Sequence, residues 1–525
     1  MPASIVLSGL SLATPDGRPL LSHIDLSFGP VRTGLVGRNG VGKSTLLHVI
    51  SGELAPAGGR VTVDGRVGVL RQAVSAGERT VADLFGVSQA LAVLDRAVSG
   101  TATAEELAEA DWTLESRLEE ALARLGLAVE PSRPLGTLSG GQRTRAALAA
   151  LVFTEPDFIL LDEPTNNLDT DGRRAVVDLL ASWRGGAIVV SHDRELLETM
   201  DATVELTSLG ATSFGGPYSQ YRAHKALELQ SARQELATAE RQVAEAARKA
   251  QEARERQARR DAGGRKEAKR GGAPKILLGG RKENAENSAG AGSVLAERQA
   301  DAAGAALSRA RERVEVLTPF SVKLAPSGLP AGKTVLQANE LSGGYDPERP
   351  VVRDVSLTMI GPERVALVGP NGVGKTTLLN LLTGRLAAVA GTVTLGGPLA
   401  MLDQQVSLLD PGASIFGNFR RLNPESTENQ CRAVLAAFMF RADAALQIVG
   451  TLSGGQMLRA GLACVLGGTT PPMLLVLDEP TNHLDVESIE VVEAGLRAFD
   501  GALLVVSHDP VFLENIGVGR RVEIG

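Results

Sequence analysis

Four sequence motifs occur twice, in the same order, along this chain of 525 residues. The segment GRNGVGKST begins at Gly37 and returns as GPNGVGKTT at Gly369, 332 positions later. LSGGQ, DEPTN and VVSHD also occur once in each half. Repetition over so long an interval indicates a duplicated domain, because each copy is long enough to bury its own core. We therefore expect two related domains, at residues 1–216 and 333–525.

Apolar runs beside the motifs predict buried strands in both copies. The runs lie at residues 33–36, 158–161, 187–190, 365–368, 474–477 and 503–506. Short uninterrupted apolar runs are typical of strands that are buried on both faces of a sheet. Because these strands alternate with helical patterns, the expected fold class is α/β with mostly parallel sheets.

The first copy is longer than the second between two of the motifs. Lys43 and Ser139 are 96 positions apart, whereas Lys375 and Ser453 are 78 apart, so the first copy holds 18 extra residues. They fall within residues 87–127, which are rich in Ala, Leu and Glu and contain no proline. This composition predicts a helical insertion. A longer helix pair without a partner of its own is the alternative.

The segment between the copies, residues 217–332, resembles neither of them. Apolar residues recur every seven positions from Leu229 onward, and alanines follow three positions after each, from Ala232 onward. The same pattern resumes after about Val294, which predicts two helices paired antiparallel along a narrow seam. The first helix, counted from Leu229 to Arg259, would be roughly 45 Å long at about 1.5 Å per residue.

A basic tip is expected between these helices, at residues 259–293. Glycines such as Gly263 and Gly264 should break the helix there. From Arg248 to Lys282 the chain has 13 Lys and Arg against 4 Asp and Glu, although its overall net charge is -7. The expected helices and tip contain no Phe, Tyr or Trp, so bases cannot stack on aromatic rings there. The tip therefore favours contact with a phosphate backbone. A solvated charged coiled coil is the alternative.

Composition also excludes several classes of protein. No apolar run approaches the roughly 20 residues that cross a bilayer, and the first ten residues do not have the pattern of a leader, so we expect a cytoplasmic protein. The two cysteines, Cys431 and Cys464, cannot form a disulfide framework or a four-thiolate zinc site. We expect both to be buried, with reactive thiols as the alternative.

Each GxxxxGK[ST] segment predicts a phosphate-binding loop. Its glycines let backbone N–H groups close around phosphate oxygens at the N-terminus of a helix. Lys43 and Lys375 can then reach the terminal phosphates, and Ser44 and Thr376 can bind Mg²⁺. Because both loops follow an apolar strand, the chain is expected to bind two nucleotides.

An aspartate ends the apolar run at the start of each DEPTN motif, and a glutamate follows it. Asp162 and Asp478 can hold the hydration shell of Mg²⁺, and the following Glu163 and Glu479 are placed to polarise an attacking water.

A histidine and a serine-glycine segment complete the repeated set. His192 and His508 each lie 30 positions after the strand aspartate. A single histidine is usually a core residue, but its recurrence in SHD favours a role at the nucleotide. The LSGGQ segments at Ser139 and Ser453 suit a second phosphate surface, offered from another domain, because each copy already has its own loop.

The order of these motifs resembles that of ATP-binding cassette ATPases in both halves of the chain. The resemblance implies two tandem P-loop cassettes that pair head to tail, so that each ATP lies between the phosphate loop of one and the LSGGQ of the other. The first site would combine Gly37, Asn39, Gly40, Gly42, Lys43, Ser44, Thr45, Gln72, Asp162, Glu163 and His192 with Ser453, Gly454 and Gly455. The second would combine Gly369, Asn371, Gly372, Gly374, Lys375, Thr376, Thr377, Gln404, Asp478, Glu479 and His508 with Ser139, Gly140 and Gly141.

The same resemblance assigns roles within each site. The catalytic residues would be Glu163, Glu479, His192 and His508. The ligands of Mg²⁺, direct or through water, would be Ser44, Gln72, Asp162, Thr376, Gln404 and Asp478. Gln404 is preferred to Gln405 because MLDQ matches VLRQ. Tyr345 fits the position at which the family stacks an aromatic ring on adenine, whereas the first copy has Thr14 there, which predicts looser binding of the base.

The linker narrows the resemblance to the ABC-F subfamily. Two cassettes in one chain, an insertion in the first and a charged helical hairpin between them are similar to that subfamily, and FGGPYSQY at Phe214 resembles its entry into the hairpin. This implies a monomer that pairs its own cassettes on ATP, binds the ribosome with its hairpin near the peptidyl transferase centre, and is released by hydrolysis. Its partners would be large-subunit rRNA and tRNA, without DNA or a membrane subunit.

Nine basic residues near the expected tip are the candidates for RNA contact. They are Arg259, Arg260, Arg265, Lys266, Lys269, Arg270, Lys275, Arg281 and Lys282. A transporter ATPase subunit would use the same nucleotide chemistry but has no obvious use for a basic hairpin, and a DNA-repair ATPase with a zinc module needs more cysteines. Within the ribosome hypothesis, the short insertion and the glycine-rich tip favour protection against antibiotics over a resident translation factor.

Overall fold

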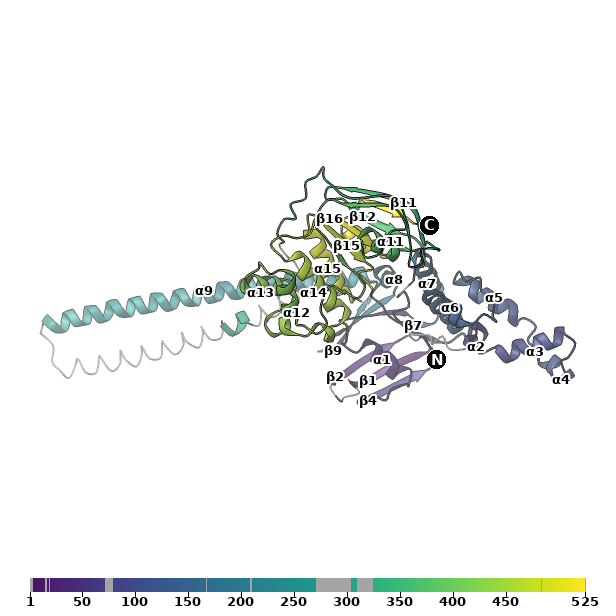
Figure 1. Cartoon of the computed structure of the whole chain (residues 1–525). Coiled ribbons are helices and arrows are strands. Elements are labelled where there is room, and N and C mark those ends of the chain that lie inside the picture. The colour runs from purple at the N-terminus through teal and green to yellow at the C-terminus, as the bar shows by residue number, and fades with distance from the viewer. Residues whose placement is uncertain are drawn as a thin grey trace. The chain divides into compact units, whose positions relative to one another are not determined.

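The computed structural model (Figure 1) contains two compact units. One comprises Met1–Ser219 together with Phe320–Gly525, and the other Gln220–Pro319. The structure describes residues 3–14, 17, 19–70, 79–166, 168–207, 210–270, 304–308, 324–482 and 484–524. Within the long helix, the side chains at 250, 253, 254, 256–258 and 260–270 lie outside this description.

The first cassette is built on two sheets. An antiparallel sheet has the strand order β2 (Pro19–Phe28), β1 (Ser4–Ala13) and β4 (Gly58–Asp64). A mostly parallel sheet has the order β5 (Val67–Leu70), β6 (Phe158–Asp162), β7 (Gly186–Val190), β3 (Arg32–Val36), β8 (Ala202–Thr207) and β9 (Gly210–Gly215). Its helices are α1 (Lys43–Ile50), α2 (Val81–Phe85), α6 (Gly140–Phe153), α7 (Thr170–Ser182), α8 (Arg194–Glu198) and the 3-10 turn η1 (Leu135–Thr137).

The second cassette repeats this plan. Its antiparallel sheet is β11 (Val352–Ile360), β10 (Thr334–Gly343) and β13 (Ala390–Leu395). Its parallel sheet is β14 (Leu399–Leu402), β15 (Leu474–Asp478), β16 (Ala502–Val506), β12 (Arg364–Val368) and β17 (Arg520–Glu523). Its helices are α11 (Lys375–Leu382), α12 (Ile415–Leu422), α13 (Glu428–Ala437), α14 (Gly454–Leu466), α15 (Val486–Ala498) and α16 (Pro510–Asn515), with 3-10 turns η2 (Ala442–Leu446) and η3 (Val449–Thr451).

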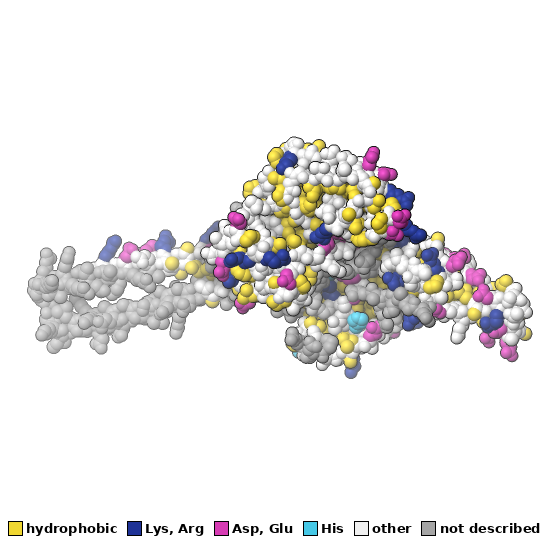
Figure 2. Space-filling model, in the orientation of Figure 1, with side chains coloured by type: hydrophobic (Ala, Val, Ile, Leu, Met, Phe, Trp, Pro, Cys, Tyr) yellow, Lys and Arg dark blue, Asp and Glu magenta, His cyan; other side chains and the backbone are white. Residues whose placement is uncertain are grey.

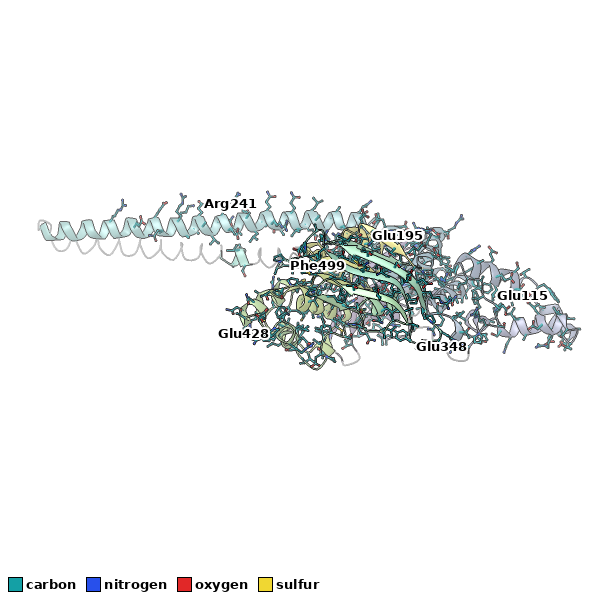
Figure 3. All side chains as sticks on the ribbon, turned by 45° about the horizontal axis from the view of Figure 1, so that its top comes forward. Glu115, Glu195, Arg241, Glu348, Glu428 and Phe499 are labelled. Carbon is teal, nitrogen blue, oxygen red and sulfur yellow. The ribbon has the colours of Figure 1, made fainter. Side chains whose placement is uncertain are left out.

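The predicted α/β class is confirmed, and the apolar runs are the central strands. Every residue of β6, β7, β15 and β16 is buried, and these strands pair in parallel. Large side chains such as Phe158 and Phe499 fill the cores and are almost fully buried; Phe499 is labelled in Figure 3. Cys431 and Cys464 are both buried, as expected, and burial raises the pKa of Cys464 to about 12, so neither is a reactive surface thiol.

The insertion at 87–127 consists of short helices. They are α3 (Ser88–Val98), α4 (Ala104–Glu109) and α5 (Leu114–Arg124). Capping boxes begin α2 and α4, in which Thr80 pairs with Asp83 and Thr103 with Glu106. The segment carries eight acidic and three basic side chains, and Figure 2 shows Asp and Glu spread over it. Its surface therefore repels phosphate, unlike the linker.

The linker begins with one long helix, α9 (Tyr218–Arg270), of 53 residues. Between positions 230 and 249, every residue that is not fully exposed belongs to the predicted seven-residue seam, with Ala232 and Ala239 buried. Arg241, on the opposite face, points into solvent in Figure 3. The periodicity in the sequence therefore identified the buried face of this helix.

Two expectations for α9 were wrong. It begins at Tyr218 and not near Leu229, and it passes through Gly263 and Gly264 without a break. A glycine inside a helix costs only about 1 kcal/mol relative to alanine, and the flanking Arg, Lys, Ala and Glu favour helix. Its length is roughly 80 Å at about 1.5 Å per residue. The second helix of the expected hairpin and the tip beyond residue 270 lie outside the described residues, apart from a helical fragment at 304–308.

No helix among the described residues is both long enough and apolar enough to cross a membrane.

Candidate nucleotide sites

Both phosphate loops have a backbone that only glycine can adopt. Gly37 and Gly369 have φ of 147° and 154°, and a Cβ on either would lie 2.3 Å from a backbone oxygen, of Leu206 or of Ile524. Gly42 and Gly374 precede α1 and α11 in the left-handed region, at φ 108° and 102°. The glycines of the motif therefore place the loop directly at a helix N-terminus, where an anion is stabilised.

The loop lysines lie beneath this backbone. Lys43 Nζ donates to the carbonyl oxygens of Gly37 and Arg38 at 2.6 and 3.1 Å. Lys375 Nζ donates to Gly369 O and Pro370 O at 2.8 and 2.9 Å. Both side chains are over 90% buried, and burial lowers the pKa of each lysine while the nearby glutamate opposes the shift. Backbone carbonyl oxygens solvate both ammonium groups but carry no full negative charge. An incoming phosphate would supply that negative charge.

The strand aspartates fit a magnesium ion. Burial raises the pKa of Asp162 and of Asp478, while hydrogen bonds from Ser44 and Thr376 oppose this rise. One oxygen of each carboxylate, Oδ1, is buried without a hydrogen-bond partner. A hydroxyl and an unsatisfied carboxylate oxygen are donors that Mg²⁺ prefers. In the described part of the chain, no three or more His, Cys, Asp or Glu side chains are grouped so that they could hold a metal ion by themselves.

The next residues, Glu163 and Glu479, have strained backbones. Their φ values are 50° and 47°, a region that non-glycine residues rarely adopt and that costs on the order of 1 to 3 kcal/mol. Each backbone N–H donates across the sheet, from Glu163 to Val190 O at 2.8 Å and from Glu479 to Val506 O at 2.9 Å. The bend turns both side chains toward the histidine segment. Strain repeated at equivalent positions indicates a functional constraint.

Burial perturbs the ionisation of these glutamates. It raises the pKa of Glu479 to about 7, with Lys375 opposing the rise, and it raises the pKa of Glu163, with Lys43 opposing. A carboxyl group that titrates near neutral pH is suited to accept a proton from water.

The two histidines face the glutamates. His192 Nε2 lies 3.0 Å from Glu163 Oε1, close but without the alignment of a hydrogen bond. His508 Nε2 lies 3.4 Å from Glu479 Oε1, 3.2 Å from Lys375 Nζ and 3.1 Å from Asn371 Oδ1. Burial lowers the pKa of His192 and lowers that of His508 to about 4, so both rings are neutral at physiological pH. The structure therefore brings loop lysine, glutamate and histidine together in each cassette.

The LSGGQ serines cap helices. Ser139 is the N-cap of α6 and accepts from Gln142 N, and Ser453 is the N-cap of α14 and accepts from Gln456 N. Both serines are exposed. The role of each segment at the ATP of the opposite phosphate loop stays a prediction. Its backbone N–H groups at a helix N-terminus nevertheless suit phosphate.

Other predicted site residues have separate positions. Thr45 and Thr377 lie in the first turns of α1 and α11. Gln404 is exposed just after β14, and Gln72 is outside the described residues. Tyr345 is 71% exposed, and its hydroxyl accepts from Asn380 Nδ2 at 3.2 Å, which leaves the ring available for stacking.

The sequence reasoning missed the residues that join the cassettes. Asn39 N donates to Asp485 Oδ2 at 2.7 Å, and Arg38 forms two hydrogen bonds with Glu487 at 2.6 and 2.5 Å. Asp485 ends the second DEPTNHLD segment and caps α15 through Ser488 N at 2.8 Å. The first phosphate loop is thus bound by the opposite cassette. The repeated final aspartate of the motif was a signal that could have revealed Asp485, whereas Arg38 is replaced by Pro370 in the second copy.

The RNA-contact candidates are only partly described. Arg259 is exposed on α9. Arg260, Arg265, Lys266, Lys269 and Arg270 lie in the helix, but their side chains are outside the description, as are Lys275, Arg281 and Lys282 entirely.

Known proteins resemble the chain along nearly its whole length. The ABC transporter family model matches residues 21–166 and 352–482. Tylosin resistance ATP-binding protein TlrC of Streptomyces fradiae is 34% identical, over 94% of this chain and 92% of its own. Energy-dependent translational throttle protein EttA of Mycobacterium tuberculosis is 31% identical, over 94% of this chain and 87% of its own.

Solved structures share the tandem fold. An RNase-L inhibitor matches with a TM-score of 0.59 at 19% identity, over 98% of this chain and 87% of its own. The archaeal ribosome recycling factor aABCE1, in complex with the stalk protein aP1, matches with a TM-score of 0.58 at 19% identity, over 97% of this chain and 86% of its own. At this identity the likeness concerns the fold alone.

Proposed function

The chain belongs to the ABC-F subfamily of ATP-binding cassette ATPases, and we propose that it is a cytoplasmic ribosome-binding switch that protects the ribosome against antibiotics. In this proposal two ATP molecules, each with Mg²⁺, close the cassettes. Closure sets the angle of the linker hairpin, so that it contacts rRNA and tRNA near the peptidyl transferase centre. Hydrolysis then releases the protein from the ribosome.

The proposed switch is supported by hydrogen bonds that join the first phosphate loop to two acidic residues of the second cassette. Asp485 and Glu487 bind the backbone of Asn39 and the side chain of Arg38. A phosphate entering that loop must act on the same segment that these carboxylates hold. ATP therefore has a direct route by which it can favour one arrangement of the cassettes over another, which is all that a ligand-driven switch requires.

Bound ATP would supply the reactive γ-phosphate, and side chains of this protein would hold the phosphates and activate the attacking water. The buried lysines would hold the terminal phosphates, with Ser44, Asp162 and their counterparts in the second copy next to Mg²⁺. Glu163 and Glu479 would take the proton of the attacking water. The neutral histidines would orient those glutamates and the γ-phosphate oxygens without adding charge.

Two features support the ribosome as partner. The basic excess near the end of α9 would gain affinity for a phosphate backbone through release of counterions. One relative is named for tylosin resistance and another as a translational throttle. The first name favours protection, and the second keeps a resident translation factor as the alternative. In the third hypothesis, that the chain is the ATPase subunit of a transporter, α9 has no evident role.

Sedimentation through a sucrose cushion would test the switch. The double variant Glu163→Gln, Glu479→Gln should remain bound to ribosomes in the presence of ATP, because hydrolysis no longer releases it. The matched control Lys43→Ala, Lys375→Ala should stay unbound. If the glutamine variant sediments no better than the lysine variant, the switch is wrong.

Drug susceptibility would separate protection from a resident role. Expression of the protein in a susceptible bacterium should raise the inhibitory concentration of a macrolide, a lincosamide or a pleuromutilin, and the lysine double variant should not. No shift for any of the three would favour the translation factor.

A further inference from the structure

In the described part of the chain, hydrogen bonds from four residues of the first cassette reach acceptors in the second. The pairs are Arg38 with Glu487, Asn39 N with Asp485, Arg173 with His508 O, and Arg194 with Glu493.

The arginines are not part of the duplicated pattern. In the aligned motifs, the second copy has Pro370 at the position of Arg38, Ile489 at that of Arg173 and Pro510 at that of Arg194. The chain therefore carries an interface in which the two ATP sites have different surroundings. Arg173 contacts a histidine segment of each site with its guanidinium.

Arg173 lies on α7, one turn after the capping residue Asp169. Its Nη1 donates to the backbone oxygen of His508 at 3.4 Å and lies 3.4 Å from Asp193 Oδ2. Asp193 directly follows His192, so one guanidinium contacts the histidine segments of both sites. Its side chain is only 16% exposed, and its Nε is buried without a hydrogen-bond partner.

This position is close enough to the second site to affect its charges. The positive charge of Arg173 lowers the pKa of Glu479, against the larger effect of burial, and it adds to the effects that lower the pKa of His508. At the first site the equivalent residue is Ile489, an apolar side chain that is 2% exposed. No charge is supplied there by that position.

We propose that Arg173 is a positioning residue that couples the two ATP sites by tying the histidine segment of one to that of the other. Nucleotide at the first site orders the segment of His192 and Asp193, and this fixes the guanidinium beside the carbonyl of His508. The second site is then preorganised when its own nucleotide arrives. By linkage, nucleotide at the second site favours binding at the first to the same degree.

The other cross-cassette ion pair supplies a contrast. Arg194 Nη2 donates to Glu493 Oε1 at 2.7 Å, and Glu493 also accepts from Asn515 Nδ2 at 3.1 Å. Arg194 therefore bonds to α15 and not to the backbone of His508. Burial raises the pKa of the neighbouring Asp509, and the charge of Arg194, like that of Arg173, opposes this rise. Weakening the pair of Arg194 and Glu493 tests whether any loss of interface contact would have the effect that we assign to Arg173.

The test is calorimetric titration of the full-length protein with the non-hydrolysable analogue adenylyl imidodiphosphate and Mg²⁺. It rests on the proposed nucleotide sites but involves neither the ribosome nor turnover, so it can fail independently of the proposed function. The natural chain should bind two analogues, the second at least ~5-fold more tightly than the first after statistical correction. In Arg173→Ile the two affinities should become equal within about twofold, because isoleucine, the residue of the second copy, fills the space without linking the segments.

A second variant and two controls complete the design. Asp193→Asn keeps a residue that can cap α8 but removes the charge beside Arg173, and it should also abolish the difference in affinity. Arg174→Ala, on the exposed face of the same helix, and Glu493→Gln should both retain it. The proposal is overturned if the natural chain binds two analogues without coupling, if both Arg173→Ile and Asp193→Asn keep the coupling, or if Glu493→Gln loses it equally.

Discussion

Replacing Glu479 by glutamine should stabilise the second cassette while it abolishes hydrolysis there. Burial raises the pKa of Glu479 from its ordinary value of 4.5 to about 7. A carboxyl group with a raised pKa in the folded state contributes stability that is fully present below pH 4.5 and is lost as the pH rises through 7. Glutamine has almost the same shape and never ionises, so the variant does not suffer this loss.

The size of the gain follows from the two pKa values. At about 1.4 kcal/mol for each tenfold change in an ionisation constant, the free energy of unfolding should rise by roughly 3 kcal/mol at pH 8. At pH 5, where the folded carboxyl group is already protonated and the unfolded one is only partly ionised, the gain should fall to roughly 1 kcal/mol. The gain should therefore grow with pH, which distinguishes it from a general packing effect.

Urea denaturation of the nucleotide-free protein at pH 5 and pH 8 would measure both values, with unfolding of the second cassette followed by hydrogen exchange of its peptides, because both tryptophans of the chain lie in the first cassette. The matched control is Glu514→Gln, because Glu514 is exposed in the same cassette and should give no change at either pH. If Glu479→Gln is no more stable than the natural chain at pH 8, or if its gain is the same at both pH values, burial does not control the ionisation of this glutamate.

Two further substitutions probe the first phosphate loop. Gly37→Ala would place a Cβ 2.3 Å from Leu206 O. In an equilibrium titration its ATP affinity should fall at least ~10-fold, roughly the effect of 1.4 kcal/mol of strain. The control Gly136→Ala, which has open space around it, should bind ATP normally in the same titration. Asp485→Ser retains a helix cap, but the serine side chain is too short to reach Asn39 N. The lost hydrogen bond to a charged group is worth about 1.5 to 3 kcal/mol. In a steady-state ATPase assay, the half-saturating ATP concentration should therefore rise at least ~10-fold. An unchanged half-saturating concentration would show that this contact does not help to close the cassettes.

The sequence by itself determined the parts of the protein that depend on local chain geometry. A phosphate loop needs glycine wherever φ is positive or a backbone oxygen lies too near, and that requirement is visible in the spacing of Gly37 and Lys43. The buried strands were equally evident, because a strand covered on both faces must be apolar throughout. The seven-residue seam of α9 identified its buried face for the same reason, since helix geometry converts sequence spacing into a direction.

Only the tertiary structure decided which residues meet across the two cassettes. Arg173 and Arg194 occur in a single copy, so the repeat could not mark them, and their acceptors lie more than 290 positions away in the chain. An arginine on a helix is ordinarily a solvated surface residue. It becomes a contact between two ATP sites only because the fold brings α7 and the second histidine segment together.

The ionisation of the glutamates and the course of α9 were also beyond the sequence. A pKa depends on burial and on neighbouring charges, and both come from packing. The glycines Gly263 and Gly264 predicted a break, but two residues of low helix propensity do not end a helix when the residues around them favour it. Motifs therefore identified the chemical groups of each site, whereas packing set their charge and joined one site to the other.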